Sequence, residues 1–340
     1  MKTLLYLNVT AIALATLLPH AHAQQILAPE PDNQTIDSQE TLNINFGESV
    51  FNALDPFTIA IGGTLDNFGG LLSNIGTLDN FGTLINDGTL DNSGTLDNFG
   101  GFLFNNVGGT LTNDGTLENF GTLENFGTLN NSGTLDNFGT LSNNGTINGS
   151  VDVKAGGILT GSGTINGSVL LGGVIDPANS TGTITTSNQT WINGASYGWE
   201  VNDSDGTAGG LVGWDLVDIT ANGNDSGSLD LSHLITGGFG IDIISLENTF
   251  TLGAAEGFDD PNGEYEFVIL TAIGGIKDFE AEDFVLNDAG FQNTGTWDWS
   301  IAQDGNNLVL KATGYLVPEP SSTALLGLGG LCLLLRRKRG

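Results

Sequence analysis

The stretch 76–93 reads GTLDNFGTLINDGTLDNS, which is three copies of one hexapeptide. Copies continue from Gly63 to Gly145, with leucine at the third place and asparagine at the fifth in almost every one. Self-similarity at a short fixed period indicates a solenoid. The motif GTINGS at 145–150 returns at 163–168, and every third copy in 76–93, 115–132 and 133–150 ends in serine. Three hexapeptides therefore form one coil, and the sequence predicts an all-β fold: a three-sided β-solenoid with about 18 residues per coil.

The hexapeptide has the composition of a short strand closed by a turn. Threonine favours strands, and alternation along a strand places the leucine inside and the acidic residue outside. Asparagine, two places after leucine, also points inward, where an unpaired amide is costly. Stacked coils remove that cost, because each amide can bond to the one above it. Glycine at the first place is expected because it adopts corner conformations that other residues resist.

Phenylalanine alternates with polar residues at the sixth place of the hexapeptide. The 18-residue period pairs Phe81 with Phe99 and Phe120 with Phe138. Three interpretations stay open at this point. The rings cover corners or fill the core, they form an exposed ladder that stacks on sugar rings, or they mediate self-association.

Composition limits the partners of the chain. The 340 residues carry 39 acidic and 8 basic side chains, a formal net charge of −31. Such a surface repels nucleic acid and anionic membranes, so we expect no nucleic-acid partner. The single cysteine, Cys332, leaves no disulfide within one chain.

The N-terminal segment 1–23 has the three parts of a secretory signal peptide. Lys2 supplies the positive charge, 4–18 supplies the apolar core, and Ala21 and Ala23 frame a small-x-small cleavage site. The sequence therefore predicts export.

The C-terminal segment 315–340 has its own three-part pattern. Val317, Pro318, Glu319 and Pro320 precede an apolar run at 323–335, and a basic cluster ends the chain with Arg336, Arg337, Lys338 and Arg339. This pattern resembles the PEP-CTERM sorting signal of Gram-negative bacteria. The resemblance implies transient inner-membrane anchoring, recognition by an exosortase-type protease, and delivery to the cell surface or extracellular matrix. It also implies exopolysaccharide or other surface proteins as partners, in a biofilm.

Between these ends we expect three segments. Residues 24–57 form a linker and an N-terminal cap, and 58–195 form the solenoid, with three inserted residues between Phe102 and Gly108. Larger side chains with period-two alternation predict a C-terminal antiparallel, β-sandwich-like domain at 196–314.

Part of the solenoid has a second resemblance. Segments 163–168, 173–184 and 197–201 resemble the right-handed β-helical passengers of autotransporter-like surface proteins, which implies a right-handed solenoid. The motif departs from the family pattern at Ala178 and Thr181. We expect no translocator barrel, so the resemblance does not imply self-transport.

Few residues in this sequence are candidates for catalysis or metal binding. Asp203 and Asp205, with Asp215 or Asp218 nearby, offer hard oxygen ligands for calcium, and a plain acidic β-turn is the alternative. His233 is the one histidine beyond the signal segment, and we expect it to be a surface residue rather than a catalytic base.

The sequence thus favours a non-enzymatic, exported structural or adhesive protein of the cell surface or matrix. The alternative is a carbohydrate-binding or polysaccharide-active β-helix protein. Asp259, Asp260 and Glu264 are its nearest paired carboxyls, and they fall in a turn-rich loop.

Overall fold

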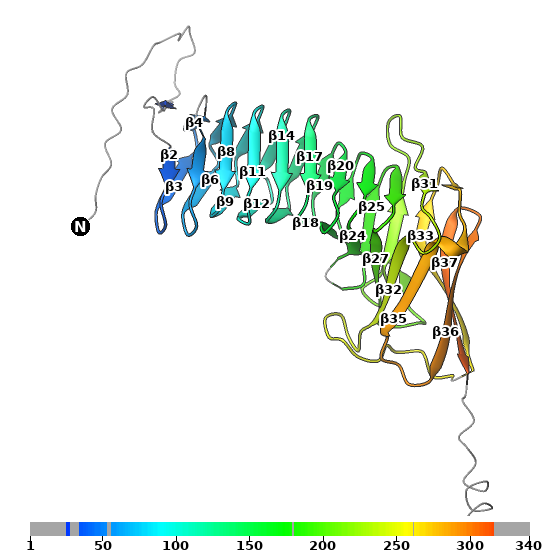
Figure 1. Ribbon diagram of the computed structural model, residues 1–340. Helices are drawn as coiled ribbons and strands as arrows, with labels where there is room; N and C mark the ends of the chain where they lie inside the picture. Colours follow the sequence, from blue (N-terminus) through cyan, green and yellow to red (C-terminus); the bar gives the residue numbers. More distant parts are fainter. Residues whose placement is uncertain (1–24, 28–33, 53–55, 179, 261, 316–340) are drawn as a thin grey trace, which may run out of the picture.

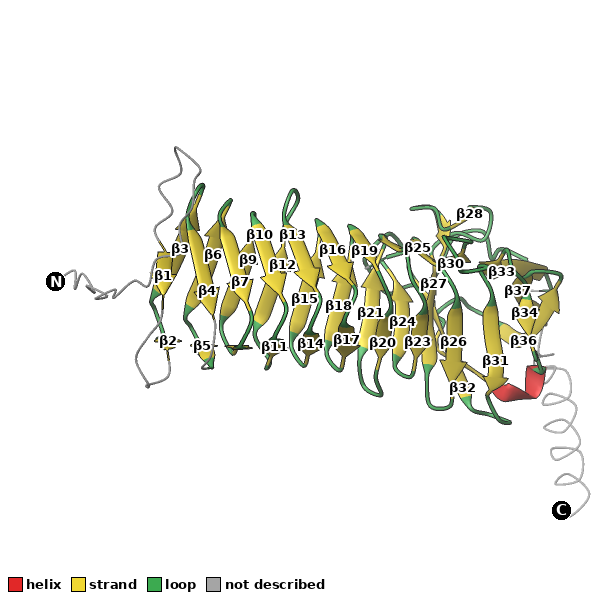
Figure 2. Cartoon of the chain, turned by 90° about the horizontal axis from the view of Figure 1, so that it is seen from above, coloured by secondary structure: helices red, strands yellow, loops and turns green. Residues whose placement is uncertain are grey.

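The computed structural model describes residues 25–27, 34–52, 56–178, 180–260 and 262–315. Over these ranges the chain winds into a rod whose three faces are three sheets, here named sheet A, sheet B and sheet C (Figure 1). The described chain has one helical element, the short 3₁₀ helix η1 (Ala281–Asp283), which lies near the C-terminal end of the rod (Figure 2).

Sheet A has 13 strands, in the spatial order β1 (Gln25–Leu27), β4 (Ser49–Asn52), β7 (Leu71–Asn74), β10 (Thr89–Asn92), β13 (Thr110–Asn113), β16 (Thr128–Asn131), β19 (Thr146–Asn148), β22 (Thr164–Ile165), β25 (Thr183–Thr186), β30 (Leu216–Ile219), β33 (Glu264–Ala272), β37 (Asn307–Tyr315) and β36 (Thr296–Asp304).

Sheet B has 11 strands, in the order β2 (Gln34–Ile36), β5 (Phe57–Ile59), β8 (Thr77–Asn80), β11 (Thr95–Asn98), β14 (Thr116–Asn119), β17 (Thr134–Asn137), β20 (Val151–Val153), β23 (Val169–Leu171), β26 (Gln189–Ile192), β31 (Leu229–His233) and β34 (Ile276–Lys277).

Sheet C runs from the N-terminal end through β3 (Thr41–Asn45), β6 (Thr64–Phe68), β9 (Thr83–Asn86), β12 (Phe102–Asn105), β15 (Thr122–Asn125), β18 (Thr140–Asn143), β21 (Ile158–Gly161), β24 (Val174–Pro177) and β27 (Ser196–Val201). At its C-terminal end β27 pairs with β29 (Gly213–Trp214), which leads to β28 (Thr207–Ala208), and also with β32 (Phe239–Ser245), which leads to β35 (Phe284–Gly290).

The strands stack in parallel and in register, one coil on the next. Leu78 pairs with Leu96, and Leu117 pairs with Leu135. Equivalent asparagines such as Asn80 and Asn98 are 18 residues apart. The predicted three-sided solenoid with this period is therefore confirmed.

The coil length varies where residues are inserted, and in the middle of the array the extra residues lie at two corners. The step from Asn98 to Asn119 is 21 residues. Gly100 and Gly108 have φ of 78° and 90°, and they lie in the turns before and after β12. The strands on either side keep their pairing, so the insertion is absorbed by the turns.

The third-place leucines form the core. All of them from Leu65 to Leu141 are at most 2% exposed, and the residue after each leucine points outward. Each fully buried leucine contributes about 1.5–3 kcal/mol of transfer free energy. The core therefore runs without a break along the rod axis.

The fifth-place asparagines form three buried hydrogen-bonded ladders, one under each sheet. In sheet B, the Asn98 Nδ2 donates to Asn119 Oδ1 at 2.7 Å, and Asn119 Nδ2 donates to Asn137 Oδ1 at 2.7 Å. The second amide hydrogen of Asn119 reaches the Thr140 carbonyl at 2.9 Å. The predicted amide stacking is confirmed, and it also ties each sheet to the strand on the next face.

The ladders have a direction, because every amide donates toward the C-terminal coil. The first acceptor of the sheet C ladder, Asn67 Oδ1, consequently has no partner among the described residues. At the other end, Asn143 Nδ2 donates to the Thr164 carbonyl at 3.1 Å. This is the same cross-face bond that Asn125 makes to the Thr146 carbonyl, so the row of amide-to-amide bonds in sheet C ends at Asn143.

Glycine occupies the first place of the hexapeptide for a different reason from the one predicted. Within the array, positive φ occurs at extra turn glycines such as Gly100, and at none of the glycines at the first place of the hexapeptide. A Cβ built on Gly115 would lie 2.0 Å from the Gly94 carbonyl oxygen, and one on Gly133 would lie 2.0 Å from that of Gly115. The first place needs glycine because consecutive coils approach there, backbone against backbone.

The solenoid extends beyond both predicted boundaries. Strands β3 and β4 already pair in parallel with β6 and β7, so part of 24–57 forms coil. After residue 195, β30 continues sheet A, β31 continues sheet B and β32 continues sheet C, all in parallel.

The antiparallel prediction for 196–314 is therefore correct only in part. Within the described residues, antiparallel strand pairing is confined to the terminal β33–β37–β36 meander and to one pair between β27 and β29. Period-two alternation cannot distinguish the two orientations. The loops between Val201 and Gly263 also hid the 18-residue period.

Replacing a middle rung of the sheet B ladder should destabilise the rod. Asn119→Ala leaves the Asn98 donor and the Asn137 acceptor buried and unpaired, at about 1–3 kcal/mol for each group. We expect the free energy of unfolding in urea to fall by about 2–4 kcal/mol.

Asn148→Ala is the matched control for this rung. Asn148 also bonds to amides above and below it, Asn166 and Asn130, but on the exposed outer face of sheet A. Its loss should be below about 1 kcal/mol, and equal losses for the two variants would contradict the buried-ladder account.

A methyl group at a corner should force adjacent coils apart. Gly115→Ala places its Cβ against the Gly94 carbonyl, so we expect a loss of at least about 2 kcal/mol in unfolding free energy. Gly198→Ala is the control, since the nearest atom to its Cβ would be 3.5 Å away. Similar urea midpoints for the two variants would disprove the close-approach explanation.

Candidate functional site

The outer face of sheet B carries rows of identical chemistry along the rod axis. The first outward residue of successive strands is a threonine, as in Thr77, Thr95 and Thr116. The second is an acid, and these acids form what we call the carboxylate row: Asp79, Asp97, Glu118, Asp136 and Asp152. The pairing register places each acid directly beside the next, at the strand spacing of about 4.8 Å.

The row concentrates negative charge on a half-buried surface. Burial, followed by the charges of Glu118 and Asp79, raises the pKa of Asp97 to about 6. Burial also raises the pKa of Asp79. Burial is thus the main cause of both shifts, and repulsion from neighbouring acids adds to the shift of Asp97.

Lysine neutralises the C-terminal end of the row. Lys154 Nζ lies 3.3 Å from a carboxylate oxygen of Asp136 and also forms an ion pair with Asp152. One ammonium thus bridges carboxylates of consecutive strands, and its pKa is raised, mainly by the hydrogen bond to Asp152. Lys154 thus shows that an ammonium group can bridge two neighbouring carboxylates of the row.

Four phenylalanines line the corner next to the carboxylate row. We call Phe81, Phe99, Phe120 and Phe138 the phenylalanine ladder. Successive ring centroids are 5.2, 5.7 and 4.6 Å apart, with interplanar angles of 19°, 14° and 6°. Each ring is 36–42% exposed, so the ladder covers a corner and does not fill the core.

The stacking of the rings limits which ring surfaces a ligand can contact. Because neighbouring rings lie nearly parallel, their faces cover one another and the edges are left toward solvent. A sugar that packs on an aromatic ring uses the ring face. The sugar-stacking interpretation therefore has little free ring face to act on within the ladder, although the predicted pairs Phe81–Phe99 and Phe120–Phe138 are confirmed.

A second group of carboxyls lies where sheet C passes from β24 to β27. Burial, followed by the charge of Glu200, raises the pKa of Asp176 to about 7, and burial raises the pKa of Glu200. Glu200 Oε2 is buried and has no hydrogen-bond partner in the described structure. The pair thus resists full ionisation at neutral pH.

Asp215 is a structural residue and not an open calcium ligand. It is fully buried, and its two oxygens accept the Gly182 and Glu200 backbone N–H groups at 2.8 and 2.9 Å. Asp203 accepts the Asp205 N–H at 2.9 Å, as in an acidic turn. Among the described residues, no three or more His, Cys, Asp or Glu side chains are grouped to hold a metal ion. The predicted trio is therefore not assembled as a metal site here.

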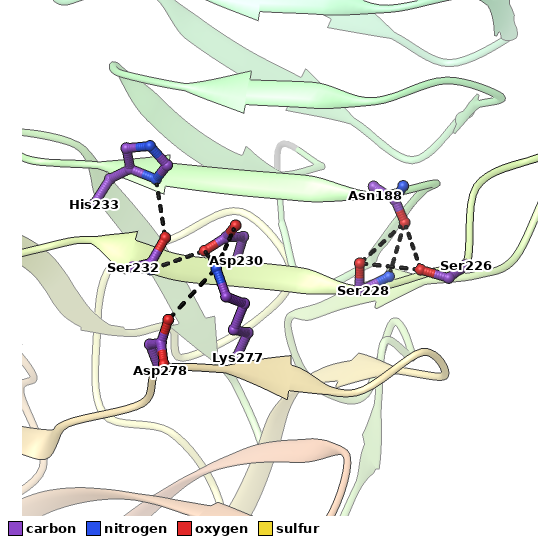
Figure 3. A network of polar contacts seen from close by, with 8 residues as sticks. All are labelled: Asn188, Ser226, Ser228, Asp230, Ser232, His233, Lys277 and Asp278. Carbon is purple, nitrogen blue, oxygen red and sulfur yellow. Dashed lines mark hydrogen bonds and ion pairs between the residues drawn. The ribbon is translucent and has the colours of Figure 1, made fainter.

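The single described histidine lies in an exposed polar network on sheet B (Figure 3). Ser232 Oγ is 3.4 Å from His233 Nδ1, and Asp230 accepts the Ser232 N–H at 2.9 Å. Lys277 Nζ also contacts Asp230, at 3.3 Å. A catalytic triad needs the carboxylate to orient the histidine, whereas here the contacts of Asp230 are with Ser232 and Lys277.

The predicted processing residues lie outside the described residues. These are Ala21 and Ala23 at the signal cleavage site, and the sorting residues Val317, Pro318, Glu319, Pro320, Arg336, Arg337, Lys338 and Arg339.

Comparison with known proteins bears on the C-terminal tail. Residues 316–339 match the PEP-CTERM protein-sorting motif. No curated protein matches the chain. The sorting motif indicates an exported protein that an exosortase sorts and that has a C-terminal membrane-anchoring tail. In the described part of the chain, no helix has the length and apolar character needed to cross a membrane.

Sequence reasoning missed the carboxylate row and its lysine. The 18-residue period alone aligns Asp79 with Asp97 and Asp136 with Lys154, whereas the true neighbour of Asp136 is Asp152. The three-residue insertion also hid the pairs Asp97–Glu118 and Phe99–Phe120. Writing the sequence coil by coil, with the insertion placed in the turns, would have revealed both rows.

The raised carboxyl pKa values predict a protein that is more stable in acid. A folded-state pKa near 7 for Asp176, against 3.8 when unfolded, means that the folded state binds more protons between these values. The stability contribution of Asp176 is complete below pH 3.8 and is lost as pH rises through 7, by up to about 4 kcal/mol. Urea midpoints should therefore fall from pH 4 to pH 8.

Asp176→Asn tests the source of this slope, because it keeps the shape and removes the charge. The variant should lose a large part of the pH dependence and be more stable than the parent at pH 8. Asp259→Asn, at an exposed turn position, should leave the slope unchanged. An unaltered slope in Asp176→Asn would show that burial of this carboxyl is not the cause.

Proposed function

We propose that this protein is a non-enzymatic structural or adhesive rod of the cell surface or extracellular matrix, associated with exopolysaccharide. The observation that carries the proposal is the combination of a sorting tail with a continuous stacked solenoid. Three amide ladders and an unbroken leucine core give a long, rigid body without any requirement for a ligand. Such a body is suited to span or bridge a polymer layer.

Surface chemistry supports a role outside the cell. A net charge of −31 keeps copies apart and hydrated, and it attracts cationic groups of a matrix. The outward residues of the repeats are threonine, asparagine and acids, which are groups that hydrogen-bond to polyhydroxylated polymers. The exposed ring edges add short apolar strips between them.

The alternative, a polysaccharide-active enzyme, has weaker support. Glycoside hydrolysis uses two carboxyls on either side of a bound sugar. The carboxylate row lies along a single sheet face, so its members flank no such position. The Asp176–Glu200 pair has the raised pKa of a general acid, and among the described carboxyls it is the pair that best suits this alternative.

Cell fractionation tests the proposed location. We expect the full chain in the surface or matrix fraction in a shortened form, and the Pro318→Ala/Pro320→Ala variant retained uncut with the inner membrane. Blotting of the fractions measures both, and Ser321→Ala, next to the motif, is the control that should behave like the parent. An uncut parent chain held in the inner membrane would contradict the proposal.

A further inference from the structure

The outer face of sheet B is an unpartnered surface with one repeating chemistry. Threonines, the carboxylate row and the phenylalanine ladder run side by side along the rod, one member of each per coil from β8 to β17. Among the described residues, Asp79, Asp97 and Glu118 form no ion pair with a basic side chain, whereas Asp136 and Asp152 share Lys154. The face is therefore charged at regular intervals and neutralised at one end.

We propose that this face binds a linear amino-sugar polysaccharide that carries free primary ammonium groups. This deepens the proposed association with exopolysaccharide and rests on it. Lys154 supplies the template for recognition, since its ammonium bridges carboxylates of adjacent strands. Ammonium groups from a polymer occupy the equivalent positions between Asp79, Asp97 and Glu118.

Charge complementarity selects a cation for this face. The pKa of Asp97 is raised by burial and by its acidic neighbours on both sides, Glu118 and Asp79. A bridging cation removes that repulsion and replaces lost hydration. A second copy of this chain would bring its own acids against the row, so self-association through this face is disfavoured.

The ring geometry explains why ion pairing, and not stacking of sugars on aromatic rings, is the main contact between this face and the polysaccharide. Faces within the phenylalanine ladder are covered by neighbouring rings, so a neutral sugar finds mainly edges. Those edges form a flat apolar border beside the acids, against which the C–H groups of a pyranose ring pack. Threonine hydroxyls on the other side accept and donate hydrogen bonds.

A lysine-rich peptide is the competing cationic partner, and it loses more conformational freedom on this face than an amino-sugar polymer does. Lysine side chains lose rotamer freedom when they are ordered, and an amine attached directly to a sugar ring has almost none to lose. The two partner classes therefore give different results in a binding test.

The test uses the purified chain and three hexamers: glucosamine, N-acetylglucosamine and lysine. We expect saturable binding of the glucosamine hexamer that weakens with salt, at least tenfold weaker binding of the acetylated hexamer, and weaker binding of hexalysine. The Asp97→Asn/Glu118→Gln variant, which keeps side-chain shape, should lose at least fivefold in affinity for the glucosamine hexamer.

Asp91→Asn is the matched control. Asp91 occupies the same place in the hexapeptide on sheet A, where its strand neighbours are Ser73 and Thr112. It should bind like the parent, and all variants should keep the parent's circular dichroism and melt at no lower temperature than the parent.

Three results would overturn the proposal: equal binding of the acetylated hexamer, equal or tighter binding of hexalysine, or unchanged affinity in the double variant. None of them alters where the protein is found in the cell. Failure of this inference is thus distinguishable from failure of the proposed function, which cell fractionation decides.

Discussion

The buried asparagine amide is the constraint on which the rest of this structure depends. An amide removed from water must have its hydrogen bonds met, or the fold loses about 1–3 kcal/mol for each unpaired group. Here the middle rungs meet that demand through the coil above and the coil below, as Asn98 and Asn119 show at 2.7 Å. A coil shifted by one residue would turn the asparagines outward and the acids inward. The amides therefore fix the register, and leucine burial supplies the driving force.

Fixed register has a consequence for the outer surface. Whatever stands at an outward place of the repeat is copied into a straight row, at the strand spacing. For acids this is unfavourable, because like charges directly opposite one another on neighbouring strands repel. The ladders and core beneath hold the row together, and Lys154 relieves it at one end. The same mechanism that stabilises the rod therefore creates its most distinctive surface, and the sorting motif indicates that this surface is exported.

Much of the fold could be predicted from the sequence because each place of the repeat holds a residue type that suits one position in a coil. The three-sided coil, inward leucine, stacked asparagine and sorting tail all follow from residue type and period. The prediction failed where the period was interrupted. Strands after residue 195 pair mainly in parallel, but alternation reads the same in either orientation and long loops separate the strands. Corner glycine was predicted for φ, whereas Gly115 is required by the Gly94 carbonyl of the preceding coil. Contacts between coils, such as Lys154 with Asp136, depend on the exact count of residues per turn and could not be located from the repeat alone.

The central claim is that neighbouring amides in a ladder stabilise one another, and a double-mutant cycle measures this most directly. The cycle compares unfolding free energies of the parent, Asn98→Ala, Asn119→Ala and the double variant. Removing both partners leaves fewer unpaired groups than the two single losses imply, so we predict a coupling energy of at least about 1 kcal/mol. Strict additivity, with a coupling energy near zero, would contradict the account.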